Sequence, residues 1–370
     1  MKHLGVSTVL VAGCGLVLAA ACGQSKETPP EPEKKVERAA AEPAAPASEE
    51  PKPAPVAEIP PELRAKCAVF EPPWGEGSWI EWGQNNPEAG ELWYTSIKDT
   101  MQQADLSVLP RCTHLENLFV GFSDLVDLKP LAGLSKLRRL DLRFIDKLAD
   151  LSPLAGLSNL EYLNVTGTAV TDLSPLVKLP RLAEFEARML PLTDAGPLAG
   201  MPALERIDLL KTPVADLAPM ARAEKLARIY ICTTKVGSIE PLLQVKERIR
   251  ALDLCATPFS DYERLAEFTA LDELRLSGMP ISDLSFLAGL TGMEKLDING
   301  TKVRDLTPLI GMKRLRSLDL SETQVTDLSP LHGLAELKKL YLIDAKIAAE
   351  QVTALKRALP DLEIVEKTPF

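Results

Sequence analysis

Residues 150–171 read DLSPLAGLSNLEYLNVTGTAVT, and variants of this segment recur through most of the chain. Its leading position occurs eleven times, and eight of the ten intervals are 22 residues long while two are 23. The leading residues are Asp105, Asp127, Asp150, Asp172, Asp194, Asp216, Ser238, Asp261, Asp283, Asp305 and Asp327. A period of about 20 to 29 residues is typical of a solenoid in which each repeat buries the apolar face of its neighbour.

The apolar spacing within one repeat predicts its two elements. Leucines stand at every third position from Leu151 to Leu160, which indicates a short 3₁₀ or single-turn helical segment. Apolar and polar residues then alternate over residues 162–166, as in a half-buried strand. Ser152 is expected to cap the free backbone donors of the helical segment, and Pro153 lacks the donor that would go unpaired there. We therefore expect an α/β solenoid with a parallel concave β-sheet and short 3₁₀ or helical convex segments.

The full pattern, LxxLxLxxTxVxDLSPLxGL, resembles the 22-residue bacterial leucine-rich repeats of the internalin type over about residues 105–364. The resemblance implies a horseshoe or arc, with about 11 rungs in residues 105–347 and a carboxyl-terminal cap in residues 348–370. A short amphipathic helix is expected from Ala348 to Ala358. The family's usual asparagine after the strand is mostly threonine here, and a threonine hydroxyl can still bond the turn backbone. These threonines are Thr168, Thr212, Thr234, Thr257, Thr301 and Thr323.

The amino terminus resembles a bacterial lipoprotein signal peptide. Lys2 precedes an apolar run from Leu4 to Ala21, and the run ends in AAAC, whose cysteine is Cys22. The resemblance implies removal of residues 1–21, lipidation of Cys22 and an extracytoplasmic protein anchored to a bacterial membrane, facing the periplasm or the cell surface. Gly23 follows the cysteine where an aspartate would resemble an inner-membrane retention mark, which favours the outer membrane. The alternatives are a lipid site at Cys14, within VAGC, and an ordinary secreted protein.

Residues 22–61 predict a disordered tether. Ten prolines lie between Gly23 and Pro61 among alanines, lysines and glutamates, so this segment cannot build a core. Without the signal peptide the chain has 41 basic and 52 acidic side chains, a net charge of −11, and it contains no dense basic run. Nucleic acid is therefore not expected as a partner.

Four further cysteines allow two disulfides in an oxidising compartment. We expect Cys67 and Cys112 to join the segment before the repeats to the first strand. Cys232 and Cys255 occupy the same position in consecutive rungs, and a strand separation of about 4.8 Å allows a bridge without demanding one. Zinc is not expected, because the chain has no CxxC motif.

Residues 62–104 contain every tryptophan of the chain: Trp74, Trp79, Trp82 and Trp93. Repeat arrays need atypical ends, so these residues are expected to form an amino-terminal cap over the leucine core. The alternative is an exposed aromatic platform for a glycan or a peptide.

Strand alternation predicts the outward side chains of the concave sheet in columns. The central column is Phe119, Asp141, Asn164, Glu186, Asp208, Tyr230, Asp253, Arg275, Asp297, Asp319 and Tyr341. The column before it includes Arg139, Tyr162, Arg206, Arg228, Lys295 and Lys339. Stacked carboxylates about 5 Å apart repel by about 0.8 kcal/mol even in water, so they need compensation.

The charges of this face allow three interpretations. Arg139, Arg206 and Lys295 are expected to neutralise the acids locally. Alternatively, the charges and interspersed tyrosines complement a protein partner, because charge patterns set specificity and aromatic side chains supply affinity. A third alternative is Ca²⁺ between stacked aspartates. We expect no resident metal and no cofactor.

The sequence indicates a binding protein rather than an enzyme. It contains no GxSxG, no phosphate-binding glycine loop, no HExxH and no cysteine with a plausible histidine base. We expect a lipid-anchored cell-envelope protein that binds a protein partner, whose identity is open, on its concave face. The alternative function is an envelope structural or glycan-binding module that uses the tryptophan-rich cap.

Overall fold

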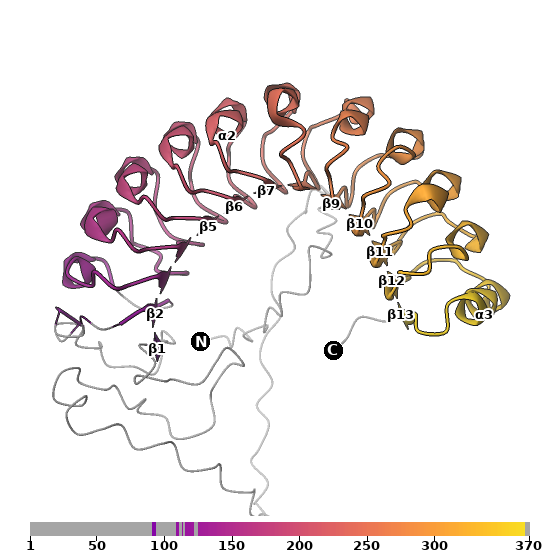
Figure 1. The fold of residues 1–370 in the computed structure, drawn as a ribbon, viewed down its shortest axis with the longest axis horizontal. Helices are drawn as coiled ribbons and strands as arrows, with labels where there is room; N and C mark the ends of the chain where they lie inside the picture. The colour runs from indigo at the N-terminus through magenta and orange to yellow at the C-terminus, as the bar shows by residue number, and fades with distance from the viewer. Residues whose placement is uncertain (1–90, 94–108, 111–112, 114, 122–124, 367–370) are drawn as a thin grey trace, which may run out of the picture.

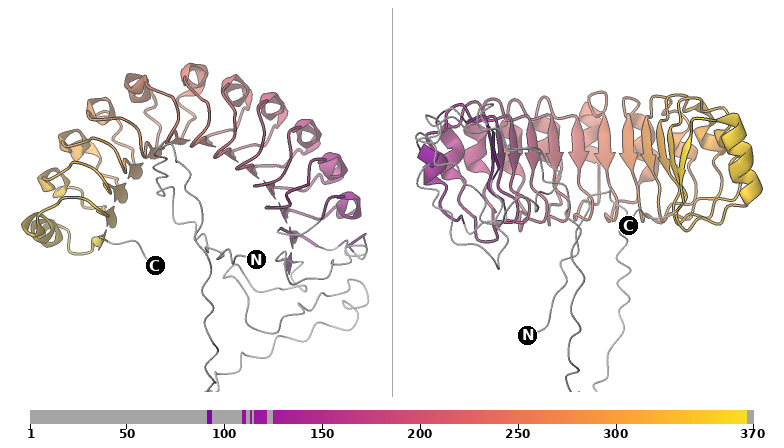
Figure 2. Two further views of the ribbon diagram at one scale, coloured as in Figure 1. Left: turned by 180° about the vertical axis from the view of Figure 1, so that it is seen from behind. Right: turned by 90° about the horizontal axis from the view of Figure 1, so that it is seen from below.

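The computed structural model describes residues 91–93, 109–110, 113, 115–121 and 125–366. These residues form an arc with strands along the inner, concave side and short helical segments along the outer, convex side (Figure 1). Seen from below, the strands lie side by side across the concave face (Figure 2). The predicted solenoid with a parallel concave sheet is therefore confirmed.

One sheet of thirteen three-residue strands runs through the described part of the chain, and its spatial order is the order in the sequence. All neighbouring strands are parallel, as shown by Leu296, which lies in register with Leu274 and Leu318. The strands are β1 (Glu91–Trp93), β2 (Asn117–Phe119), β3 (Arg139–Asp141), β4 (Tyr162–Asn164), β5 (Glu184–Glu186), β6 (Arg206–Asp208), β7 (Arg228–Tyr230), β8 (Ala251–Asp253), β9 (Glu273–Arg275), β10 (Lys295–Asp297), β11 (Ser317–Asp319), β12 (Lys339–Tyr341) and β13 (Glu363–Val365).

The convex side consists of short helical segments, most of them 3₁₀ helices, as the spacing of three predicts. The 3₁₀ helices are η3 (Lys129–Leu131), η4 (Ser152–Gly156), η5 (Ser174–Lys178), η6 (Gly196–Gly200), η7 (Glu240–Val245), η8 (Tyr262–Glu267), η9 (Ser285–Leu287), η10 (Thr307–Gly311) and η11 (Ser329–Leu331). The α-helices are α2 (Ala218–Arg222) and α3 (Ala349–Ala358).

The leading aspartate, rather than the serine, binds the backbone at the start of most convex segments. Asp150 Oδ1 accepts a hydrogen bond from the backbone N–H of Ser152 at 2.8 Å, and η4 has no side-chain cap from Ser152. The expectation that serine caps the segment is wrong, because a carboxylate two residues earlier is a stronger acceptor than a hydroxyl. The same contact recurs at Asp127, Asp172, Asp194, Asp216, Asp283, Asp305 and Asp327.

The buried leucines form one continuous core from Leu109 to Leu362. Six of the turns that follow strands are closed by the predicted threonines, whose hydroxyls donate to the carbonyl oxygens three residues earlier at 2.7 or 2.8 Å. The residue before the threonine takes a left-handed conformation, for example Gly167 at φ 69° and Lys211 at φ 57°. The threonine expectation is therefore confirmed.

The ends of the described arc add two features. Strand β1 extends the sheet by pairing with β2, although it lies inside the residues predicted to form the amino-terminal cap. At the other end, α3 lies where the sequence predicts a helix, and Gln351 Oε1 accepts a hydrogen bond from the backbone N–H of Leu328 at 3.2 Å. Leu355 of α3 is fully buried, so α3 covers the apolar side of the last rung.

Several sequence predictions lie outside the described residues. They are the signal peptide 1–21 with Cys22, the tether 22–61, the Cys67–Cys112 bridge, and the positions of Trp74, Trp79 and Trp82. Of Trp93, only its place in the backbone of β1 is described. No helix among the described residues combines the length and the apolar character that a membrane crossing requires.

Candidate binding face on the concave sheet

The strand register places the predicted central column together in space, each residue beside its neighbour in the next strand. The same alternation produces a third column, two residues after the central one. Its members include Arg143, Thr166, Arg188, Leu210, Cys232, Cys255, Ser277, Asn299 and Ser321. We call the outward side chains of these three columns the concave face.

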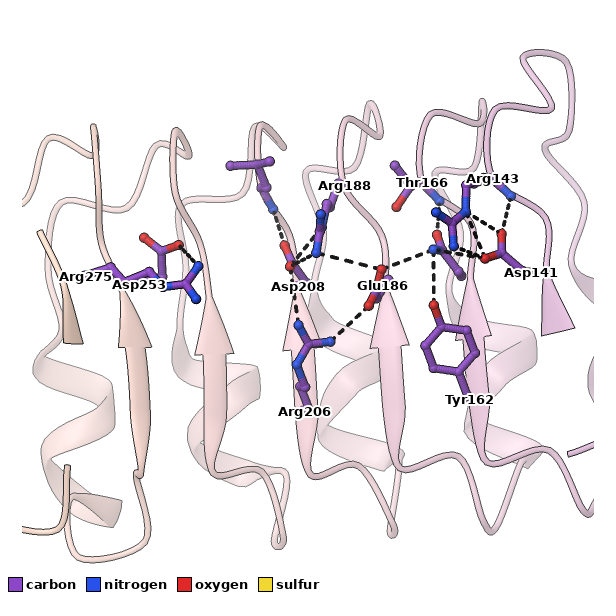
Figure 3. Close-up of polar contacts among 12 residues, drawn as sticks. Asp141, Arg143, Tyr162, Thr166, Glu186, Arg188, Arg206, Asp208, Asp253 and Arg275 are labelled. Carbon is purple, nitrogen blue, oxygen red and sulfur yellow. Dashed lines mark hydrogen bonds and ion pairs between the residues drawn. The ribbon is translucent and has the colours of Figure 1, made fainter. Parts of the chain in front are cut away.

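One ion-pair network on this face joins Glu186 and Asp208 through two arginines (Figure 3). Arg188 lies 2.8 Å from Asp208 Oδ2 and 3.8 Å from Glu186 Oε2. From the opposite side, Arg206 lies 3.1 Å from Glu186 Oε1 and 3.8 Å from Asp208 Oδ2. Each carboxylate is thus held between two guanidinium groups, which fixes all four side chains in one arrangement.

Hydrogen bonds extend this network through Asn164, whose Nδ2 also lies 3.5 Å from Asp141 Oδ2 in β3. Asn164 Nδ2 donates to Glu186 Oε2 at 3.1 Å and to the Tyr162 hydroxyl at 3.3 Å. Arg143 binds Asp141 through Nε at 2.9 Å and 2.8 Å from the two carboxylate oxygens, and also through its NH2 group. Burial raises the pKa of Asp141 although Arg143 opposes the shift, so the arginine offsets part of the cost of burying this acid.

Arginine side chains lie over tyrosine rings on the same face, in cation–π contacts. The Arg139 guanidinium lies 4.3 Å from the ring centre of Tyr162, and Arg206 and Arg275 lie 4.7 Å and 5.4 Å from that of Tyr230. Burial, reinforced by nearby carboxylates, raises the pKa of Tyr162 to about 12, so its hydroxyl stays protonated at neutral pH. A shallow depression of about 420 Å³ opens beside Arg139 and Tyr162.

Glu273 is a charged group of the concave face that the sequence prediction missed. The residue is only 4 % exposed, and Arg275 lies 2.8 Å from its Oε1. Arg228 and Lys295 approach its Oε2 at 3.7 Å and 3.8 Å, and the Tyr230 hydroxyl donates to the same oxygen at 3.4 Å. Glu273 could have been found by completing its column, since it lies in register between Ala251 and Lys295.

The predicted local neutralisation occurs, but largely through other residues. Of the three cations named for it, only Arg206 pairs with acids of the central column. Arg139 lies over Tyr162, and Lys295 pairs with Glu273. The main partners of Asp141 and Asp208 are Arg143 and Arg188, which stand in the third column and could have been found by extending the alternation by one position.

Two acids further along the central column are shifted toward the protonated form. Burial raises the pKa of Asp253 to about 7, against the opposing charge of Arg275. Burial, together with the neighbouring charge of Asp319, raises the pKa of Asp297 to about 6. The charge of these two carboxylates therefore depends on pH near neutrality.

A disulfide between Cys232 and Cys255 crosses the third column, with a Cα–Cα distance of 4.6 Å. The sequence prediction left this bridge open, and the structure contains it. Both sulfur atoms lie within 4.8 Å of a carboxylate oxygen of Asp253. Because the sulfurs are bonded to each other, they do not offer the thiolate ligands that a metal would need.

Solved structures share this architecture. An internalin from Listeria monocytogenes aligns with a TM-score of 0.58 and 26 % identity over 72 % of this chain and 78 % of that one. The chain has the leucine-rich-repeat fold. A leucine-rich-repeat protein of Leptospira interrogans aligns with a TM-score of 0.57 and 17 % identity over 70 % of this chain and 74 % of that one.

A third structure is the leucine-rich-repeat ectodomain of a receptor kinase from Arabidopsis thaliana, solved in complex with CASPARIAN STRIP INTEGRITY FACTOR 2. Its TM-score is 0.51 and its identity 16 %, over 70 % of this chain and 36 % of that one. No protein-family model and no curated protein matches the chain.

Proposed function

We propose that this leucine-rich-repeat protein is a non-catalytic binding protein of the bacterial cell envelope that binds a protein partner on its concave face. The observation that carries the proposal is the arginine, tyrosine and carboxylate network from β3 to β7. Arginine and tyrosine dominate binding energy at protein interfaces. Because ion pairs already hold these side chains in place, a partner would lose little free energy to ordering them.

Two exposed cations, one at the start of this network in β3 and one further along the concave face in β10, offer sites for an acidic partner surface. Arg139 and Lys295 are exposed on the concave face, while most acids of the central column are buried or half-buried. The acids thus fix the neighbouring arginine side chains of the face through ion pairs, and the exposed cations attract an acidic partner as it approaches. The non-catalytic part of the proposal is supported by the sequence, which contains no GxSxG, no HExxH and no phosphate-binding glycine loop.

Replacing Arg139 and Lys295 together by glutamate should reduce partner binding at least about tenfold, a change of ~1.4 kcal/mol, because the new charges repel an acidic partner. The measurement is crosslinking of intact cells that make the protein, followed by quantitative mass spectrometry of the crosslinked proteins. The matched control replaces Lys178 and Arg222 by glutamate, since both are exposed on the convex side and the change in net charge is the same.

The outcome separates the two functions considered. Partners that the concave variant loses and the convex variant keeps support the proposal. Equal recovery by both variants, with circular dichroism unchanged, contradicts it. Saturable binding of purified peptidoglycan or polysaccharide that the concave variant retains would instead favour the glycan-binding module with the tryptophan-rich cap.

Membrane anchoring through Cys22 forms the second part of the proposal. It is supported by the lipoprotein-like sequence around Cys22 and by the disulfide, which suits an oxidising compartment. Cys22→Ser should move most of the protein from the membrane fraction to the soluble fraction on cell fractionation, because stable anchoring needs the acyl chains. Cys14→Ser is the matched control and should leave the protein with the membrane. Release by Cys14→Ser alone would place the lipid site at Cys14 instead.

A further inference from the structure

The acids of the central column differ along the arc in whether an arginine pairs with them. Arginine side chains lie within 4 Å of Asp141, Glu186, Asp208 and Asp253. For Asp297 and Asp319, no lysine, arginine or histidine of the described residues forms such an ion pair. The nearest cations are engaged with Glu273, since Arg275 lies 2.8 Å and Lys295 3.8 Å from its carboxylate oxygens.

Asp297 and Asp319 are direct neighbours across parallel strands. They lie in register in β10 and β11, and each accepts a backbone hydrogen bond through Oδ1 only, from Asn299 at 3.0 Å and from Ser321 at 2.8 Å. These bonds fix both carboxylates and turn one oxygen of each, Oδ2, away from the backbone donor. The sheet therefore holds two like charges side by side on half-buried side chains.

Two unpartnered oxygens lie against this pair. Asn299 is 4 % exposed, and its Oδ1 accepts no hydrogen bond, while its amide lies close enough to Asp319 to lower the pKa of that acid. Ser277 is 8 % exposed, and its hydroxyl lies close enough to Asp297 to lower the pKa of that acid without a well-formed hydrogen bond. Buried polar atoms are costly without a partner, so these two atoms favour a ligand that binds between them and the two carboxylates.

We propose that this part of the concave face binds one divalent cation, and that Ca²⁺ fits it best. The protein donors are Asp297 Oδ2, Asp319 Oδ2, Asn299 Oδ1 and Ser277 Oγ. The donors are carboxylate, amide and hydroxyl oxygens, with water completing the six to eight ligands that Ca²⁺ takes. The site does not depend on the proposed protein partner.

These four oxygen donors fit Ca²⁺ better than they fit zinc or magnesium. Zinc prefers nitrogen and sulfur ligands, and none of these donors is either. Magnesium demands a tight octahedral arrangement and keeps most of its water, whereas donors spread over three rungs suit the larger, more adaptable Ca²⁺. Ca²⁺ sites of extracellular modules have dissociation constants on the order of 10⁻⁴ to 10⁻³ M.

Calorimetric titration of the full mature chain with CaCl₂, in buffer with excess KCl, should reveal one saturable site in that range, and the same titration with MgCl₂ should show weaker binding. Asp297→Asn should weaken Ca²⁺ binding at least about tenfold. Mutating a residue that only hydrogen-bonds to a metal ligand already lowers metal affinity about 10- to 100-fold, and Asp297 is a proposed ligand itself. Asn299→Ala should do the same by removing an amide oxygen. Asp297→Asn keeps the acceptor for the Asn299 backbone N–H, so the fold is expected to persist.

Asp305→Asn provides the matched control. Asp305 is an acid of the same rung whose Oδ1 accepts from the backbone N–H of Thr307, but it lies at the start of η10 rather than on the concave face. This variant should bind Ca²⁺ as the unaltered chain does. No saturable Ca²⁺ binding up to about 10 mM, well above the expected range, would overturn the proposal. Equal affinity in Asp297→Asn and the unaltered chain would overturn it too, by placing the ion elsewhere.

Discussion

Replacing Leu318 by alanine should lower the free energy of unfolding by about 2–5 kcal/mol. Leu318 is fully buried at the centre of β11, in register with Leu296 on one side and Leu340 on the other. A rung cannot shelter its leucine alone, so the cavity removes contacts with both neighbouring rungs. Urea unfolding of the mature chain, followed by circular dichroism, measures the loss.

Ile310→Ala is the matched control for this cavity. Ile310 lies in the same repeat, in η10, but its side chain is 46 % exposed on the convex side. Removing it should change the free energy of unfolding by no more than about 0.5 kcal/mol. Equal effects of the two substitutions would mean that the stacked leucines do not carry the stability of the arc.

Removing the Cys232–Cys255 disulfide should cost about 3 kcal/mol of unfolding free energy. The bridge closes a loop with a sequence separation of 23 residues. Closing a loop of this length lowers the conformational entropy of the unfolded chain, which stabilises the folded state by about 3 kcal/mol. The Cys232→Ala/Cys255→Ala double variant, compared with the oxidised unaltered chain by urea unfolding, gives the value. Free thiols at both positions, found by mass mapping of protein purified without reductant, would contradict the bridge.

A reductant separates this bridge from the one predicted between Cys67 and Cys112. Dithiothreitol should destabilise the unaltered chain and have less effect on the double variant, which has already lost the Cys232–Cys255 bridge. Any destabilisation that remains in the double variant reports a second disulfide, and Cys67 and Cys112 are the candidates. A complete absence of this remaining effect would count against that pair.

The arginine network explains why the prediction of the concave face was incomplete. The position of each outward side chain follows from strand alternation, and this is why Asp141, Glu186 and Asp208 were found. Alternation does not say which of several neighbouring cations a carboxylate will bind. Arg139 and Arg143 flank Asp141 equally in the sequence, yet only Arg143 pairs with it, while Arg139 lies over Tyr162. Side-chain packing across strands makes that choice.

The repeat by itself determined the fold. A period near 22 residues, with leucines at spacings of three and then two, can be buried only by stacking rungs, so the solenoid, the parallel sheet and the 3₁₀ segments followed from local pattern. The arc and the threonine turns followed from the resemblance to bacterial leucine-rich repeats. The tertiary structure alone decided the pairing of charges, the disulfide between Cys232 and Cys255, and the place of Ser277 and Asn299 beside the stacked Asp297 and Asp319. These features depend on distances of a few ångströms between side chains from different rungs, and a one-dimensional pattern does not contain such distances.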